Sequence, residues 1–230
     1  MLLEFNNLRK DYGKTNVLDI ESLSIDKGEC VGLVGNNGAG KTTAFSLILD
    51  LIQTSNGAVL TKGNDVSKSE NWKSYTSAFL DETFLVDFLT PNEYFDFVGG
   101  LNNWSKGEVK NFINQFEEFF NGEVLGVKKY IRDLSKGNQK KVGIVGALIG
   151  NPEIVILDEP FASLDPTSQI RLKKIIRERM ELHTFLISSH DLTHVAEVCN
   201  RIVILEKGKV VMDNPKTDET IQQMTEYFHV

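Results

Sequence analysis

The sequence has 230 residues, of which 41% are hydrophobic and 25% are charged, and its net charge is −7. These proportions are typical of a globular protein with a real apolar core, and the acidic balance argues against a general nucleic-acid binder. The start of the chain lacks the basic and apolar segments of a signal peptide, and no stretch approaches the ~18 apolar residues that span a bilayer. We therefore expect a cytoplasmic chain that meets a membrane only through a partner.

Strand and helix patterns alternate along the chain, which predicts an α/β fold with a mostly parallel sheet. Residues 2–8 and 22–26 have the pattern of early strands. The apolar run 29–35 ends in glycine, as a buried strand does. Helical spacing follows over residues 41–52, with apolar side chains on one face.

The middle of the chain predicts helices. Nine of the 14 phenylalanines fall between Phe79 and Phe120. Thr90 is placed to cap a helix that begins with Pro91, and Glu93 is placed to reach back to the cap. We therefore expect an inserted helical subdomain.

Strand patterns return after this segment, at residues 153–160 and 184–190, and the last strands form a hairpin that turns at Lys207 and Gly208. The two cysteines, Cys30 and Cys199, lack metal-ligand spacing, and we interpret them as structural thiols. We divide the chain into a core with an N-terminal antiparallel β subdomain (1–84), the helical subdomain (85–150) and the rest of the core (151–230).

Residues 35–42, "GNNGAGKT", match the phosphate-loop pattern of glycine, four residues, glycine, lysine and Ser/Thr. Glycines allow successive backbone N–H groups to point at phosphate oxygens, and the helix that follows adds its positive N-terminal end. Lys41 is placed to reach the β- and γ-phosphates, and the Thr42 hydroxyl to ligate Mg²⁺. A chance glycine-rich turn is the alternative, but the position between a strand and a helix favours a phosphate site.

Two further motifs follow apolar strands. Asp158 and Glu159 end the run "IVILDEP", and a carboxylate at the end of a strand can hold Mg²⁺ while its neighbour acts as general base on water. The alternative is a buried strand that leads into a polar turn. His190 ends "LISSH" and is placed to contact a γ-phosphate or the water, whereas we expect structural or exposed roles for His183, His194 and His229.

These motifs, in this order, resemble the ATP-binding subunits of ABC transporters, and the resemblance covers nearly the whole chain. Residues 134–138, "LSKGN", are similar to the family signature, which usually reads LSGGQ. Residues 162–165, "ASLD", resemble the D-loop with Asp165. Tyr12 matches the aromatic residue that stacks on adenine, although a partly exposed loop tyrosine is the alternative.

The resemblance implies a P-loop NTPase fold that binds and hydrolyses ATP with Mg²⁺. Two subunits would close head-to-tail, so that each ATP lies between the phosphate loop of one chain and the signature of the other. The catalytic residues would be Glu159 and His190. The ATP-binding set would be Tyr12, Gly35, Asn36, Asn37, Gly38, Ala39, Gly40, Lys41, Thr42 and Thr43. The signature set, acting in trans, would be Ser135, Lys136, Gly137 and Asn138. The metal ligands would be Thr42, Asp81 and Asp158.

The start of the predicted helix supports the signature reading, because Ser135 is a good N-cap and a helix N-terminus suits a γ-phosphate. Lys136 and Asn138 depart from the usual glycine and glutamine. Asp81, followed by Glu82, stands where the family has a glutamine that binds Mg²⁺ and senses the membrane partner. We expect Lys140 and Lys141, which follow the signature, to be solvated or to contact another part of the chain.

The phenylalanine-rich middle has two interpretations, the core of the helical subdomain or a groove for a helix of a membrane permease. Phe112 and Phe116 fit the core. Phe79, Phe84 and Phe88 lie outside the regular helical face and are the better groove candidates.

We expect the chain to power a separate permease from the cytoplasmic face of the membrane, as part of an exporter, since a carboxylate at position 81 resembles some exporters of peptides and drugs. One alternative is a non-transport ABC ATPase acting on nucleic acid or the ribosome. Only 94 positions separate Lys41 from Ser135, with no coiled coil between them, and the chain holds one ATPase unit, so we expect no nucleic-acid partner. A regulator that binds nucleotide without hydrolysis is disfavoured by Glu159 and His190.

Overall fold

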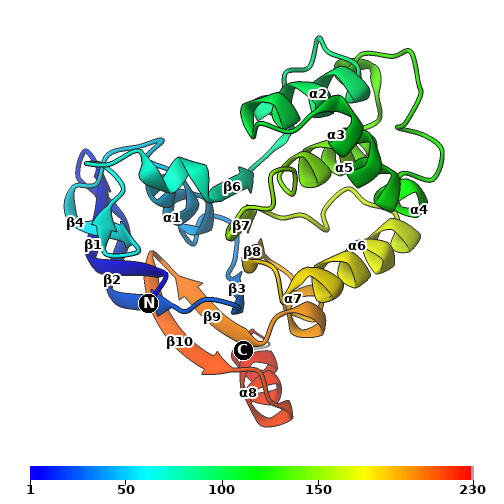
Figure 1. Cartoon of the computed structure of the whole chain (residues 1–230). Coiled ribbons are helices and arrows are strands. Elements are labelled where there is room, and N and C mark those ends of the chain that lie inside the picture. Colours follow the sequence, from blue (N-terminus) through cyan, green and yellow to red (C-terminus); the bar gives the residue numbers. More distant parts are fainter. Residues whose placement is uncertain (229–230) are drawn as a thin grey trace.

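The computed structural model describes residues 1–228 and begins with an antiparallel sheet (Figure 1). The first strand pairs on both sides, with the second strand and with the fourth. In spatial order the strands are β2 (Thr15–Ile25), β1 (Leu3–Tyr12), β4 (Asn56–Thr61) and β5 (Asn64–Asp65). The predicted N-terminal antiparallel subdomain is confirmed, and its strands are longer than the sequence patterns indicated.

The second sheet has six strands, and all neighbouring pairs are parallel except the last hairpin. In spatial order they are β10 (Lys209–Pro215), β9 (Arg201–Glu206), β3 (Cys30–Val34), β8 (Thr184–Ser189), β7 (Ile154–Leu157) and β6 (Thr76–Phe79). The central strands are buried along their whole length, which explains their unbroken apolar sequences. Lys207 and Gly208 have positive φ angles of 47° and 80°, as the predicted hairpin turn requires.

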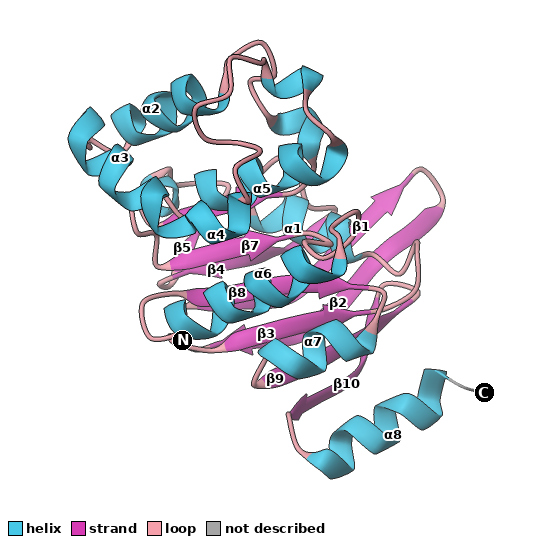
Figure 2. Ribbon diagram, turned by 90° about the vertical axis from the view of Figure 1, so that its right-hand side faces the viewer, coloured by secondary structure: helices cyan, strands magenta, loops and turns pink. Residues whose placement is uncertain are grey.

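Helices lie against this sheet, and one further helix lies beyond its last strand (Figure 2). Those flanking the sheet are α1 (Lys41–Ile48), α6 (Pro166–Arg179) and α7 (Leu192–Val198), and α8 (Asp218–Phe228) follows the last strand. Helix α1 ends earlier than the pattern over 41–52 predicted. No helix among residues 1–228 is both long enough and apolar enough to cross a bilayer.

The helical subdomain lies between strands β6 and β7 in the sequence and at one end of the molecule in space (Figure 1, green). Its α-helices are α2 (Pro91–Leu101), α3 (Lys106–Ile113), α4 (Glu117–Phe120) and α5 (Lys136–Gly146). Its short 3₁₀ segments are η2 (Glu82–Phe84), η3 (Asn114–Phe116) and η4 (Ile131–Asp133), whereas η1 (Asn71–Ser74) precedes β6. The predicted capping box at Thr90 and Glu93 is present.

The core of this subdomain contains Phe112 and Phe116, as predicted, together with Phe95, Phe119 and Phe120. Phe84 and Phe88 are 59% and 60% exposed, so they remain available to a partner. The interpretation of Phe79 as a groove residue is wrong. It is 3% exposed at the end of β6, and its ring fills the space beside Gly143 of α5, where a Cβ atom would lie 2.1 Å from the ring.

The two cysteines are free, buried thiols. Cys30 begins β3 and Cys199 follows α7, and their sulfur atoms lie 3.4 Å apart. The predicted structural role agrees with this burial, but their proximity has no signal in the sequence, because it depends on how α7 packs on the sheet.

Candidate functional site

The phosphate loop joins strand β3 to helix α1 at the carboxyl end of the parallel sheet. Gly38 and Gly40 have φ angles of 82° and 107°, which favour glycine, and Gly40 caps the helix without a side chain. Lys41 is 6% exposed, and its Nζ donates to the carbonyl of Gly35 at 2.6 Å. The loop thus curls around the lysine ammonium, and the N-terminus of α1 faces the same side.

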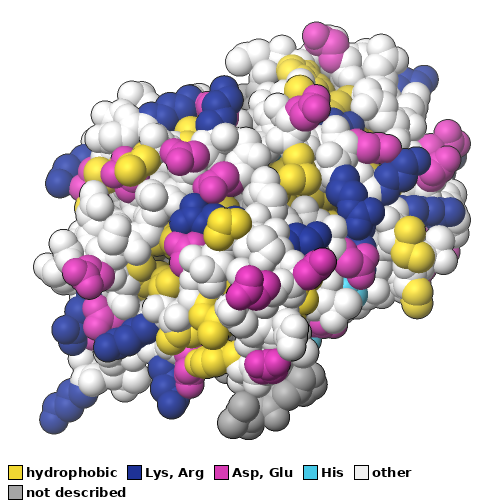
Figure 3. Space-filling view, turned by 90° about the horizontal axis from the view of Figure 1, so that it is seen from below, with side chains coloured by type: hydrophobic (Ala, Val, Ile, Leu, Met, Phe, Trp, Pro, Cys, Tyr) yellow, Lys and Arg dark blue, Asp and Glu magenta, His cyan; other side chains and the backbone are white. Residues whose placement is uncertain are grey.

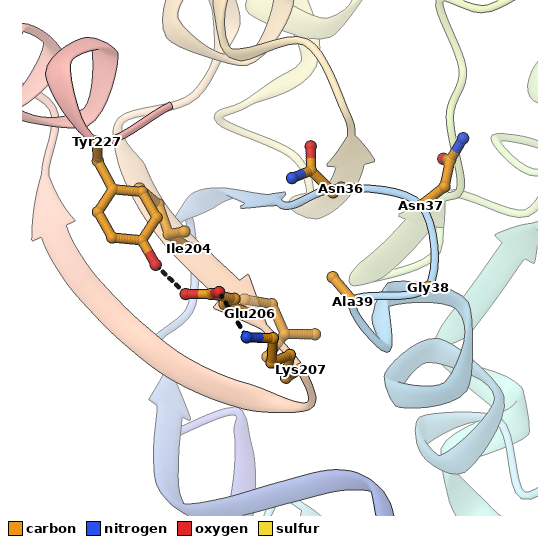
Figure 4. Close-up of a pocket in the computed structure, with 9 residues that line it drawn as sticks. Asn36, Asn37, Gly38, Ala39, Ile204, Glu206, Lys207 and Tyr227 are labelled. Carbon is orange, nitrogen blue, oxygen red and sulfur yellow. Dashed lines mark hydrogen bonds and ion pairs between the residues drawn. The ribbon is translucent and has the colours of Figure 1, made fainter. Parts of the chain in front are cut away.

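Two hollows share Asn37, Gly38 and Ala39 of this loop. The smaller, of about 190 Å³, holds the chemical groups of the predicted site, and it is lined by Val17, Asn37, Gly38, Ala39, Gly40, Lys41, Thr42, Thr43 and Glu159. The larger, of about 620 Å³, lies beside Asn36, Asn37, Glu206, Lys207 and Tyr227 (Figure 4). There the Tyr227 hydroxyl donates to Glu206, which also pairs with Lys207. We place the candidate site in the smaller hollow, because Lys41, Thr42 and Glu159 line it.

Thr42 and Asp158 meet where α1 begins and β7 ends. The Thr42 hydroxyl donates to Oδ2 of Asp158 at 2.5 Å, and the Ser188 hydroxyl donates to the other carboxylate oxygen. Burial raises the pKa of the Asp158 carboxyl, and these two hydrogen bonds oppose the rise. The pair offers two hard oxygen ligands in a partly desolvated position, which fits Mg²⁺.

Within residues 1–228 no three His, Cys, Asp or Glu side chains cluster to hold a metal on their own. This is compatible with Mg²⁺, which keeps several waters and shares its remaining positions between one or two protein oxygens and phosphate oxygens.

Glu159 lies at the edge of the pocket and contacts the other predicted catalytic groups. Its Oε2 is 2.8 Å from Nδ1 of His190, and its Oε1 is 3.3 Å from Nζ of Lys41, an ion-pair distance without hydrogen-bond geometry. Its φ angle is 45°, which is uncommon for a residue with a side chain. The Ser188 hydroxyl accepts from its backbone N–H at 2.8 Å. The chain thus turns sharply after Asp158 and presents the next carboxylate to the lysine and the histidine.

The predicted signature segment begins helix α5. Ser135 is the N-cap, and its hydroxyl accepts from the backbone N–H of Asn138 at 3.3 Å. The Asn138 amide donates to Glu123 at 3.1 Å, and a Cβ atom at Gly137 would lie 2.9 Å from the carbonyl of Ser163. None of the described residues lining the pocket at the phosphate loop comes from this segment.

The remaining predicted residues have local roles in the single chain. Asp165 caps α6, accepting from Ser168 N–H at 3.0 Å, and Asp81 caps a short 3₁₀ turn, accepting from Thr83 N–H at 2.6 Å. Tyr12 is 52% exposed at the end of β1, with Nζ of Lys10 4.7 Å from its ring centre, and it is not among the residues lining the pocket. Their functional roles stay predictions.

The family model for ABC transporters matches residues 18–162. The chain belongs to the ABC transporter family. It is an ATP-binding subunit of that family of ATPases. The linearmycin resistance ATP-binding protein LnrL of Bacillus subtilis is 31% identical over 233 residues, which cover 97% of this chain and 75% of that protein. An uncharacterised ABC transporter ATP-binding protein of Synechocystis is 34% identical over 83% of this chain, but the chain spans only 54% of its length.

Solved structures agree with this assignment. The ATP-binding subunit of an ABC transporter superposes with a TM-score of 0.85 at 29% identity, covering 98% of this chain and 94% of the other. An ATP-binding cassette in a dimeric post-hydrolysis state, bound to ADP and Pi, shares the fold with a TM-score of 0.81 at 21% identity, covering 94% and 99%. The Synechocystis relative and the first of these structures are named as ABC transporter proteins, so the alternative of a non-transport ABC ATPase is not favoured.

At the site of this ABC ATPase the sequence offered no prediction for Ser188 and two alternatives for Lys140. The Ser188 hydroxyl hydrogen-bonds both the Asp158 carboxylate and the backbone N–H of Glu159. In the sequence, only its position at the end of the neighbouring strand, two residues before His190, indicates that it lies at the site. Lys140 was expected to be solvated or to contact another part of the chain. It is not solvated: it is 6% exposed and donates to the carbonyl of Glu159. Lys141 is also buried, at 3% exposed, because α5 packs between the subdomain core and the sheet.

His183 and His194 have structural roles, which agrees with the prediction for them. His183 is buried and bound to the carbonyl of Pro152, His194 stacks on Phe161, and His229 lies outside the described residues.

The charged side chains do not gather into one region on the face in Figure 3. Basic and acidic groups are interspersed there, with apolar groups between them, and the basic groups form no continuous patch. That face of the ABC subunit therefore lacks the electrostatic footprint of a nucleic-acid surface.

Proposed function

We propose that this chain hydrolyses ATP with Mg²⁺ and thereby drives transport through a separate membrane permease. The observation that carries the proposal is the meeting of Lys41, Thr42, Asp158, Glu159 and His190 at the carboxyl end of one parallel sheet, joined by contacts of 2.5–3.3 Å. In such a site positioning and charge neutralisation provide most of the rate enhancement for phosphoryl transfer.

Each side chain has a role that its position supports. Lys41 and the loop N–H groups would hold the β- and γ-phosphates. The Thr42 hydroxyl and the Asp158 carboxylate would hold Mg²⁺, which supplies positive charge beside the phosphate oxygens. Glu159 would accept a proton from the attacking water, while His190 holds the carboxylate in place. Asp81 would approach the Mg²⁺ shell from the end of β6, if its carboxylate left Thr83.

The second half of the nucleotide site would come from another chain. Ser135, Lys136, Gly137 and Asn138 form a helix N-terminus that offers a hydroxyl and backbone N–H groups to a γ-phosphate. They do not line the pocket of their own phosphate loop, which supports action in trans in a head-to-tail dimer. Tyr12 would stack on adenine, and Asp165 would contact the partner chain.

A mixing experiment tests this composite site. Lys41→Ala removes the phosphate contact of one chain, and Ser135→Arg blocks the signature of the other. Each variant alone should be inactive, because both of its composite sites contain the defect. A mixture should recover activity, since the mixed dimer holds one site made from the intact phosphate loop and the intact signature. Absence of recovery, with mixed dimers shown to form, would contradict the head-to-tail arrangement.

The permease contact would use the exposed aromatic residues Phe84 and Phe88, which lie on the segment between β6 and α2. Membrane association would then be peripheral, on the cytoplasmic face and through the permease. We infer export as the direction, because of the acid at position 81 and because LnrL is named for resistance to linearmycin. Purification of the chain from its native membranes should recover an integral membrane protein together with it. Recovery of ribosomes or nucleic acid in its place would contradict the transport function.

A further inference from the structure

Lys140 is a buried cation in helix α5 that reaches across to the catalytic segment. Its Nζ donates to the backbone carbonyl of Glu159 at 2.9 Å and lies 3.8 Å from a carboxylate oxygen of Glu82. Three separate segments meet at this ammonium: the helix that follows the signature, the turn after β6 and the turn after β7. A solvated lysine would have none of these contacts.

The backbone that Lys140 contacts is unusual. Glu159 has a φ angle of 45°, and a non-glycine residue keeps such a conformation when its surroundings determine it. The backbone N–H of Glu159 donates to the Ser188 hydroxyl at 2.8 Å. The carbonyl of Glu159 accepts from Lys140 and, at 3.2 Å, from the N–H of Ala162. The peptide groups on both sides of Glu159 are therefore held, one by strand β8 and the other by helix α5.

The charges around Lys140 explain why a cation is retained there. Burial disfavours the ammonium, whereas Glu82, Glu159 and Asp158 favour it. Glu82 stands beside Asp81 in the turn after β6, so the cation lies between that turn and the two acids of the nucleotide site. A neutral side chain would leave three carboxylates close together with less compensation.

We propose that Lys140 is a positioning residue for hydrolysis, which fixes the main chain of Glu159 so that its carboxylate faces the phosphate pocket. This inference rests on the proposed role of Glu159 as general base. Lys140 touches no reacting atom. Its effect is on the geometry of the base, so its loss should slow the chemical step and leave nucleotide binding intact.

Three variants test the proposal by steady-state hydrolysis and by nucleotide binding. Lys140→Met keeps the apolar stem and removes the donor, and we expect kcat to fall about tenfold or more, as loss of a charged hydrogen bond implies, with KM unchanged within about twofold. Lys140→Arg should restore most of the rate. Lys141→Met is the matched control, since Lys141 is equally buried on the same helix and approaches the ring of Phe119, 5.7 Å away. It should keep the parent rate.

Thermal unfolding of each variant separates positioning from loss of fold. Removal of one partner of a buried charge cluster destabilises, so Lys140→Met should melt at a lower temperature than the parent, and its kcat is measured well below that temperature, where the chain is fully folded. If Lys140→Met does not fold, Lys140→Gln takes its place with the same expected fall in kcat. A parent-like kcat in Lys140→Met, an equal fall in Lys141→Met, or a rise in KM alone would each overturn the proposal.

A double variant separates this inference from the function on which it rests. In the Glu159→Gln background there is no base to position, so adding Lys140→Met should lower the residual rate no further. A further tenfold fall would mean that Lys140 acts elsewhere. Full activity of Glu159→Gln itself would overturn the assigned base. An inactive Glu159→Gln beside a fully active Lys140→Met would remove the positioning role and leave the proposed function intact.

Discussion

Nδ1 of His190 lies 2.8 Å from Oε2 of Glu159, so the residue after strand β8 holds the carboxylate that follows strand β7. The two strands are parallel neighbours, and the contact therefore follows from their register at the edge of the sheet. It gives the proposed base a fixed orientation on one side, while Lys41 approaches the other carboxylate oxygen.

Replacement of the proposed base gives the first prediction. Glu159→Gln keeps the shape and the contact with His190 but loses the proton acceptor, so kcat should fall at least about 100-fold. ATP binding should remain, and the ATP-bound dimer should accumulate, because hydrolysis no longer separates the chains. Pi release and size-exclusion chromatography with ATP measure the two effects. Undiminished turnover would rule out this residue as the base.

The exposed aromatic pair gives the second prediction. Phe84→Ser with Phe88→Ser should leave the hydrolysis rate of the isolated chain within about twofold, because neither side chain lines the pocket. Binding to the permease should weaken at least about 30-fold, since buried aromatic anchors at interfaces contribute about 2 kcal/mol or more. Ile170→Ser is the control, because Ile170 is 67% exposed on helix α6. Equal binding by all three proteins would exclude this surface.

The close packing of Phe79 on Gly143 gives the third prediction. Gly143→Ala places a methyl group where the ring lies, and overpacking of this kind should destabilise the chain by about 1–3 kcal/mol. Gly100→Ala, in helix α2, meets no atom within 4 Å and should leave stability unchanged or raise it by up to about 1 kcal/mol. Urea unfolding followed by circular dichroism compares them. Equal stability of the two variants would mean that the ring moves aside at little cost.

The buried histidine gives a prediction about acid stability. Burial lowers the pKa of His183 below 6.5, and the charge of Arg179 adds to this effect. Between the lowered pKa and 6.5 the unfolded chain binds more protons than the folded chain, so stability rises with pH across this window and is lost as pH falls. Nδ1 of His183 already bonds the carbonyl of Pro152, and Nε2 has no partner among the described residues. A proton added to Nε2 would therefore have no hydrogen-bond acceptor there.

His183→Gln should therefore lose less unfolding free energy than the parent between pH 7.5 and pH 5.5. Chemical denaturation at the two pH values measures the difference. Some pH dependence should remain, because the pKa of His194 is also lowered by burial. An identical loss in the parent and the variant would show that His183 does not titrate in this range.

Much of the nucleotide site could be predicted from the sequence because each part is local. The phosphate loop is one continuous segment, and Asp158, Glu159 and His190 each follow an apolar strand. Because the carboxyl ends of parallel strands lie at the same edge of a sheet, these residues are expected to lie close together. The hairpin turn at Lys207 and Gly208 is local in the same way.

What the sequence left wrong or open concerns residues whose environment depends on packing between distant segments. Phe79 was a groove candidate because it lies outside the regular helical face, but Gly143, 64 positions later, leaves the space that its ring fills. For Lys140 the sequence left two alternatives, a solvated lysine or one that contacts another part of the chain, and the second holds because its helix packs on the two segments that carry Glu82 and Glu159. No periodicity within one segment reports such a contact.

The buried thiols of Cys30 and Cys199 are native probes of local opening in this protein. Both are buried, Cys30 at the start of strand β3, which leads into the phosphate loop, and Cys199 after helix α7, so a thiol reagent reaches them only after a local opening. The rate at which a thiol reagent labels the native protein thus reports local opening around strand β3. A nucleotide that binds the phosphate loop should slow this labelling.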